Sequence, residues 1–213
     1  MIGRRILLVE GLDDKCVFYS IFNERQICGR DDVDIKVEEN KQTLLKNLPV
    51  HLKGSNIEAL GVVLDADADL ENSWLSIYDR LIRAGYEGVP TEPFPSGTVI
   101  SAPENSLLPR VGIWLMPNNQ TTGILEDFLR LLVPQPNMLF THAERSIDSI
   151  PQELRLFSEV AKPKVLIHTW LAWQRKPGKP LGLSITARFL DPTLPAADDL
   201  VSWLKRVFFP DNP

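Results

Sequence analysis

The chain has 213 residues, of which 44% are hydrophobic, and a formal net charge of −5 at pH 7. This length fits one large domain or one domain with an appended lobe, and the hydrophobic content is ordinary for a globular fold. The negative charge argues against nucleic-acid binding through bulk electrostatics alone but does not exclude local binding. No apolar stretch approaches the about 18 residues of a membrane-spanning helix, and no basic region followed by a long apolar one starts the chain. We therefore expect a soluble, cytoplasmic protein with no membrane partner.

The first half of the chain alternates predicted strands with predicted helices. The predicted strands cover residues 5–10, 33–38 and 59–65. One helix follows Asp13 and Asp14, a second covers residues 41–52, and a third ends at Gly85. The apolar faces of the first and third helices are Val17, Phe18, Ile21 and Phe22, and Trp74, Ile77, Tyr78, Leu81 and Ile82, respectively. This alternation is typical of a parallel sheet with crossover helices.

A proline-rich connection follows at residues 86–110, which we expect to cross the surface around one short strand at residues 98–101. A further strand is predicted over residues 111–116, and Gly123 opens a helix with Glu126 and Asp127 in its first turn.

The last third is predicted to be mostly helical. Its predicted helices cover residues 152–160, 164–175 and 197–208. We therefore expect an α/β fold, with a parallel, Rossmann-like sheet flanked by helices and a mostly helical C-terminal part. The expected organisation is a core over residues 1–120, with a helical region over residues 121–213 packed on it as one structural unit.

Cysteine and tryptophan residues give weaker indications of a site. Cys16 and Cys28 offer no disulfide framework, and neither lies in a CxxC motif or near a histidine, so we expect reduced, partly buried thiols. Trp170 and Trp173 could stack on nucleic-acid bases. Core packing is the favoured interpretation, because aromatic side chains dominate buried area. The histidines are scattered and are assigned no role.

Two of the predicted strands end abruptly in acidic residues. Glu10 follows the first apolar run and Asp14 lies one helical turn beyond it, whereas Asp65 and Asp67 end the third strand. Ligands of open α/β sheets bind at the carboxyl ends of the strands. In an extended segment Asp65 and Asp67 would point the same way, so both could reach one cation. Carboxylates gathered there would raise one another's pKa values unless a cation neutralised them, and oxygen ligands indicate Mg²⁺ or Mn²⁺.

These motifs resemble a known domain. The segment VEGLDD at residues 9–14, followed by a later strand that ends in Asp-x-Asp, is similar to the Toprim domain. That domain occurs in bacterial primases, type IA and type II topoisomerases, small ribosomal RNA maturases and overcoming-lysogenization-defect nucleases. The resemblance covers about residues 4–120. A narrower resemblance, to a family of uncharacterised prokaryotic Toprim-like proteins, rests on residues 112–119, 123–128, 168–174 and 177–178.

The Toprim resemblance implies roles for individual residues. It makes Glu10 an acid or base and a metal ligand, and it makes Asp65 and Asp67 metal ligands. Asp14 matches a second acid of the nuclease branch. That branch also uses later acids and a lysine, which no motif identifies here. The further candidates without a motif match are Asp69, Glu126, Asp127, Lys164 and Lys179.

The implied function is that of a nuclease, a Mg²⁺- or Mn²⁺-dependent hydrolase of phosphodiesters in DNA or RNA. No GxxxxGK[ST] motif occurs, so an ATPase partner would have to act in trans. Two alternatives stay open: a catalytically silent Toprim-like module that binds nucleic acid or a partner, and a metal-dependent phosphatase or nucleotide-sugar enzyme. A calcium loop is excluded, because Leu70 and Ser76 occupy the positions of its required Gly and Glu.

Overall fold

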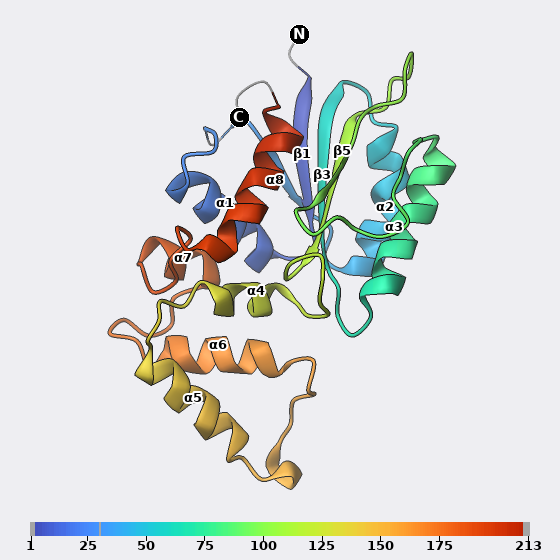
Figure 1. The fold of residues 1–213 in the computed structure, drawn as a ribbon. Helices are drawn as coiled ribbons and strands as arrows, with labels where there is room; N and C mark the ends of the chain where they lie inside the picture. The colour runs from blue at the N-terminus through green and yellow to red at the C-terminus, as the bar shows by residue number, and fades with distance from the viewer. Residues whose placement is uncertain (1–2, 30, 211–213) are drawn as a thin grey trace.

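The computed structural model, which describes residues 3–29 and 31–210, is an α/β fold built on a five-stranded sheet (Figure 1). The strands lie in the order β2-β1-β3-β5-β4, and all neighbours pair in parallel except β4 and β5, which are antiparallel. The strand bounds are β1 Arg4–Val9, β2 Asp34–Val37, β3 Ile57–Asp65, β4 Thr98–Ile100 and β5 Arg110–Met116. The predicted fold class is confirmed, and each predicted strand agrees with an observed one to within two residues at either end.

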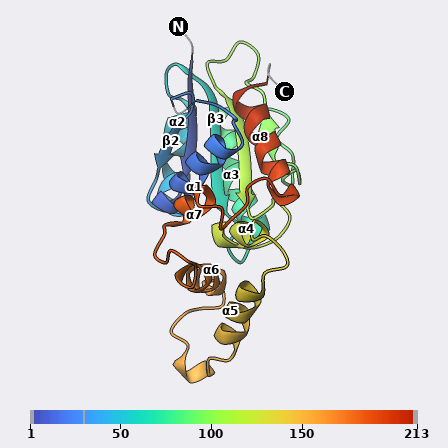
Figure 2. The same ribbon diagram turned by 90° about the vertical axis from the view of Figure 1, so that its left-hand side faces the viewer.

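Helices cover both faces of the sheet (Figures 1 and 2). The helix bounds are α1 Leu12–Glu24, α2 Lys41–Leu52, α3 Leu70–Ala84, α4 Leu125–Leu131, α5 Met138–Asp148, α6 Lys162–Ala172, α7 Leu181–Thr186 and α8 Asp198–Phe208. Helices α2 and α3 share one buried core with strand residues such as Leu8, whereas α1 and α8 share the other with residues such as Leu7. Because successive strand residues point to opposite faces, burial on both sides explains the continuous apolar runs.

Helix α8 approaches the sheet closely at two glycines. A Cβ atom at Gly61 of β3 would lie 2.8 Å from Phe208, and one at Gly112 of β5 would lie 2.1 Å from Val207. Both distances are shorter than real Cβ contacts, so only glycine lets the helix pack at this depth. The buried residues of the helix are Leu200, Val201, Trp203, Leu204, Val207 and Phe208.

The helices α4, α5 and α6 lie at the end of the sheet where the parallel strands finish (Figure 2). Helix α4 packs on α6, and α6 packs on α5. Helix α7 then returns to α1, where the Ser20 hydroxyl donates a hydrogen bond of 2.9 Å to the carbonyl oxygen of Gly182. Segments before and after residue 120 therefore contact each other. The boundary between a core of residues 1–120 and a helical region of residues 121–213 stays a prediction.

The prediction of a helix over residues 152–160 is wrong. Only the short 3₁₀ helix Gln152–Leu154 forms there, and Leu154 and Leu156 are 65% and 100% exposed. A short helix needs a buried face to be stable. In this segment Phe157 packs against the core only as a partly buried side chain, and no residue of the segment is fully buried. The expectations also lack α5 and α7, and they place α6 two residues too late at its start and three too late at its end.

Some expected core side chains are exposed instead. Ile82 is 45% exposed at the margin of α3, and Cys16 is exposed on α1, whereas Cys28 is partly buried as expected. Trp170 is buried, but Trp173 is 41% exposed and packs on His142 with ring centroids 5.5 Å apart. Periodicity correctly selects the middle of each buried face, but tertiary contacts decide how wide that face is. No helix within residues 3–29 and 31–210 combines the length and apolarity needed to cross a bilayer.

The close packing of α8 predicts the effect of Gly112→Ala. The added methyl group would overlap Val207, so we expect the free energy of unfolding to fall by about 1–3 kcal/mol in chemical denaturation. The substitution Val207→Ala removes the overlapping methyl groups. The double variant should therefore be more stable than the sum of the two single effects implies, and strictly additive effects would contradict this packing.

Candidate acid cluster at the carboxyl ends of the strands

Glu10 and Asp65 meet where β1 and β3 end. These strands are parallel neighbours, so their carboxyl ends lie side by side. The Asp65 backbone N–H donates a 2.8 Å hydrogen bond to the carboxylate of Glu10. The Asp65 carboxylate in turn accepts a 2.9 Å hydrogen bond from the backbone N–H of Leu125, the first residue of α4. The sheet edge and the start of α4 therefore hold both acids in place.

Asp14 adds a carboxylate from the first turn of α1. Its side chain accepts a 3.1 Å hydrogen bond from the backbone N–H of Gly11, which is a capping interaction. This cap would explain an aspartate here without any function. However, burial and repulsion by Glu126 raise the pKa of Asp14 to about 6, despite the hydrogen bonds that lower it. The side chain therefore belongs to a larger group of acids as well as to the helix cap.

The buried acids have strongly raised pKa values. Burial is the main cause of the rise in the pKa of Glu10 to about 7, and Asp14 and Asp67 add repulsion. Burial is also the main cause of the rise in the pKa of Asp65 to about 9, with repulsion from Glu10, Asp14, Asp67 and Glu126. We call Glu10, Asp14, Asp65, Asp67 and Glu126 the acid cluster. The carboxyls of Glu10, Asp14 and Asp65 keep their protons to a higher pH than the same groups would in water.

Lys41 is a member of the site that the sequence analysis does not identify. Its ammonium group donates hydrogen bonds of 2.7 Å to the Asp65 carbonyl oxygen, 2.7 Å to the Asp67 carboxylate and 2.8 Å to the Ser73 hydroxyl. All three of its donors are therefore used. The feature of the sequence that could have identified Lys41 is its position in the first turn of α2. A positive charge there is unfavourable with the helix dipole, so a nearby acid is needed to stabilise it.

Asp67 is not arranged as the sequence analysis expects. Strand β3 ends at Asp65, and Asp67 has a left-handed backbone with φ of 54°. Its backbone N–H and carbonyl each form a 2.8 Å hydrogen bond with Gly123. The expectation that Asp65 and Asp67 point the same way from an extended segment is therefore wrong. Asp67 instead turns towards Lys41, although its charge still raises the pKa of Asp65.

Glu126 and Lys164 join the cluster from the C-terminal helices. The Glu126 side chain is only 5% exposed, and its carboxylate lies 3.3 Å from the Lys164 ammonium group. The pKa of Lys164 is raised, mainly by Glu126 and with smaller contributions from Asp13 and Asp14. Glu126 and Lys164, which no motif identified, therefore lie near the acidic residues of α1 and β3.

The remaining candidates have other surroundings. Asp69 caps α3 by accepting a hydrogen bond from the Asn72 backbone N–H. Asp127 caps α4 by accepting one from Ile124, and it lies 3.7 Å from Arg130. No hydrogen bond or ion pair links Lys179 to the acid cluster in the described part of the chain.

The donor set suits a hard divalent cation, because it consists of carboxylate oxygens that lack enough positive charge nearby. The arrangement of these side chains is less favourable for binding a metal ion. No group of three or more His, Cys, Asp or Glu side chains in residues 3–29 and 31–210 is arranged to hold a metal ion. Asp67 in addition would have to leave Lys41 before it could bind such an ion.

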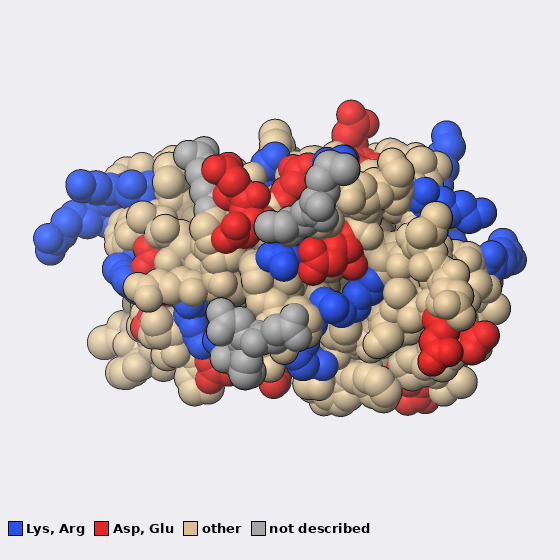
Figure 3. Space-filling model, turned by 90° about the horizontal axis from the view of Figure 1, so that it is seen from above, with Lys and Arg blue, Asp and Glu red and all other residues tan. Residues whose placement is uncertain are grey.

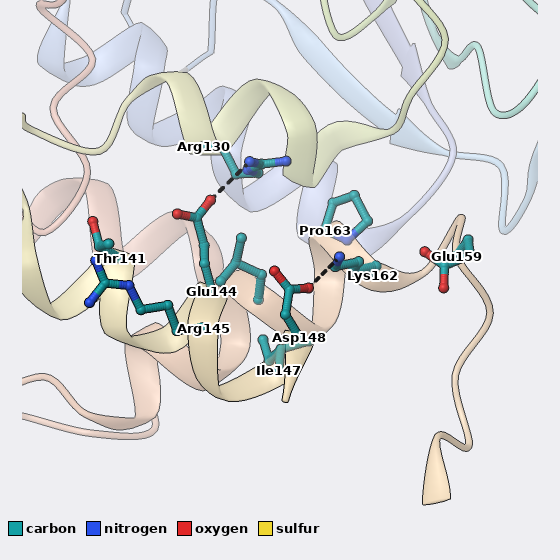
Figure 4. Close-up of a pocket in the computed structure, with 10 residues that line it drawn as sticks. Arg130, Thr141, Glu144, Arg145, Ile147, Asp148, Glu159, Lys162 and Pro163 are labelled. Carbon is teal, nitrogen blue, oxygen red and sulfur yellow. Dashed lines mark hydrogen bonds and ion pairs between the residues drawn. The ribbon is translucent and has the colours of Figure 1, made fainter. Parts of the chain in front are cut away.

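A separate pocket of about 540 Å³ lies between α4, α5 and α6 (Figure 4). Four of its charged residues form two ion pairs with one another. Arg130 lies 3.1 Å from Glu144, and Lys162 lies 2.6 Å from Asp148. These pairs connect the three helices, and the lining contains none of the acid cluster. We therefore interpret the pocket as a junction between helices.

Lys41→Met tests the hydrogen bonds that connect the start of α2 to Asp65, Asp67 and Ser73. Methionine keeps the apolar stem but removes all three donors, so we expect the free energy of unfolding to fall by about 1–3 kcal/mol. Lys46→Met, at an exposed position of the same helix, should change it by no more than about 0.5 kcal/mol in the same denaturation experiment. Equal effects of the two substitutions would contradict the assigned role of Lys41.

Asp65→Asn tests the raised pKa of the buried acid. Between pH 3.8 and about 9 the folded protein keeps a proton that the unfolded chain releases, so the stability of the wild type should fall as pH rises. Asparagine cannot ionise and still accepts from Leu125. Without divalent cations, the melting temperature of the variant should fall less than that of the wild type between pH 7 and 9. Parallel profiles would show that Asp65 is already ionised at neutral pH.

Comparison with known proteins identifies the family of the chain. The model of a family described as a protein of unknown function (DUF3226) matches residues 4–209. That range contains all the strands and helices given above, and with them the acid cluster. No curated protein and no solved structure matches the chain. The chain belongs to the DUF3226 family.

Proposed function

We propose that this protein is a Mg²⁺- or Mn²⁺-dependent nuclease that hydrolyses phosphodiesters at the acid cluster. The observation that carries the proposal is the convergence of buried acids with raised pKa values at the ends of β1 and β3. Perturbed acids at the carboxyl edge of an α/β sheet indicate a functional site. The resemblance to Toprim nucleases supports the same reaction.

The proposed reaction gives separate roles to the residues of the site. Glu10, Asp14 and Asp65 would supply oxygen ligands to the cation, with Asp67 available if it exchanges Lys41 for the metal. When bound, a divalent cation lowers the pKa of a water ligand and stabilises the charge of the leaving oxygen. Glu10 has a pKa near 7 in the absence of metal, which suits a group that holds or accepts a proton near neutral pH. Lys164 lies beside Glu126, where it can contact a phosphate.

A second candidate function is a catalytically silent module that binds nucleic acid or a protein partner. The ion pair of 2.7 Å between Lys41 and Asp67 favours it, because one expected metal ligand is already neutralised by the protein. The absence of a preformed three-carboxylate site in the described residues favours it too. The two candidates differ in turnover, which a cleavage assay measures directly.

Glu10→Gln and Asp65→Asn test the nuclease proposal. Purified wild type should cleave DNA or RNA when Mg²⁺ or Mn²⁺ is added and should stop when the metal is chelated. Each substitution removes a carboxyl group that could ionise and bind the cation but keeps the shape of the side chain, so we expect at least a roughly 100-fold loss of cleavage rate with the fold intact. Gel analysis of labelled single-stranded and double-stranded substrates gives the rates.

Asp69→Asn is the matched control. This aspartate lies in the same loop, but it caps α3 through a hydrogen bond that asparagine also accepts. The variant should retain wild-type cleavage. Full activity in Glu10→Gln would overturn the assignment of the site, and metal binding without cleavage of any substrate would favour the silent module.

A further inference from the structure

The charges of this chain are unevenly distributed along its sequence. No Asp or Glu occurs between Glu159 and Asp191, and we call residues 160–190 the basic segment. Its basic residues are Lys162, Lys164, Arg175, Lys176, Lys179 and Arg188. All 28 acidic residues of the chain and the other 17 of its 23 basic residues lie elsewhere. The net charge of −5 therefore conceals one strongly cationic stretch.

The basic segment begins at the acid cluster. It comprises α6, the turn of residues 173–180 and α7, which lie at the same end of the molecule as α4 (Figure 1). Near the start of α6, Lys164 pairs with Glu126. The segment then leads away from the cluster along α6 and returns to the body of the protein where α7 packs on α1.

Within the basic segment, the turn carries the cations that form no ion pair in the described part of the chain. Lys162, Lys164 and Arg188 each form an ion pair. By contrast, Arg175, Lys176 and Lys179 form no ion pair within residues 3–29 and 31–210, and the first two are exposed. These three charges lie within five residues, so they present a local positive field to solvent.

An exposed face of α6 connects this turn to the acid cluster. Lys164, His168 and Ala172 are all exposed, and their spacing of four residues places them on one side of the helix. A helix of 11 residues spans about 16 Å. A nucleic-acid strand advances about 3.4 Å per nucleotide in a duplex, so this length corresponds to roughly five nucleotides.

We propose that the basic segment binds the phosphate backbone of a nucleic acid, with the turn of residues 173–180 as its main anchor. The proposal rests on the proposed function for the substrate class. The acid cluster repels phosphate, so a substrate needs cations nearby to hold it, and phosphate contacts position a nucleic acid without reading its sequence. At the opposite end of the molecule, acidic and basic side chains are mixed over the middle of the visible face (Figure 3).

Charge reversal of the turn tests the proposal. The triple variant Arg175→Glu, Lys176→Glu and Lys179→Glu is compared with Lys46→Glu, Lys53→Glu and Arg83→Glu, which reverses three exposed cations on the side of α2 and α3. Fluorescence anisotropy with labelled single-stranded DNA and RNA of about 20 nucleotides gives the affinities. The measurements are made in EDTA, so binding is observed without metal and without cleavage.

The turn variant should bind at least about tenfold more weakly than the wild type at 50 mM salt, and the slope of log affinity against log salt should fall by about 2–3. The control triple should bind within about twofold of the wild type. A triple variant with Gln at positions 175, 176 and 179, which removes the charges without reversing them, should show a smaller loss of affinity. Wild-type affinity in the turn variant, or equal losses in both reversals, would overturn the proposal.

The result is separable from the nuclease proposal. Binding that depends on the turn, without cleavage by the wild type in Mg²⁺ or Mn²⁺, would overturn the nuclease activity and support the basic segment as a binding surface. Metal-dependent cleavage that Glu10→Gln abolishes, together with unchanged binding by the turn variant, would overturn the role of the basic segment alone.

Discussion

The hydrogen bond from the Asp65 backbone N–H to the Glu10 carboxylate is the interaction on which the rest of the site depends. It joins the ends of two neighbouring parallel strands, so it also sets where the chain can leave the sheet. From there, the carboxylate of Asp65 accepts from the first N–H of α4, which places α4 across the strand ends. Helix α4 is therefore attached to the sheet edge through one of the acids that we propose as metal ligands.

The site is a balance between buried negative charge and the few cations that reach it. Desolvation disfavours ionised carboxylates, and their mutual repulsion adds to that cost, which explains the raised pKa values of Glu10 and Asp65. Lys41 and Lys164 offset part of this charge from opposite sides, the first through Asp67 and the second through Glu126. Without a bound cation the pKa values of Glu10, Asp14 and Asp65 stay raised, and this excess of buried carboxyl groups is the basis for proposing a divalent cation.

The accuracy of the sequence-based predictions differs between the two halves of the chain for a physical reason. Strands buried on both faces and amphipathic helices packed on them leave strong local patterns, so residues 4–116 were predicted to within a few residues. The segment around residues 152–160 has helix-forming residues, but only Phe157 packs against the core, and most of the segment is not helical. Conversely, α5 is helical because Phe140, Ala143 and Ile147 are buried against its neighbours.

The amino-acid sequence by itself determined the α/β class, the strands and the positions of Glu10, Asp14 and Asp65 at the sheet edge, because each follows from short-range patterning and from the geometry of parallel strands. Only the tertiary structure decided which charges meet there. Lys41 and Asp67 are 26 residues apart, and Glu126 and Lys164 come from two different helices. No local pattern encodes such pairs, since they arise when separate elements pack against one sheet edge and buried acids require nearby cations.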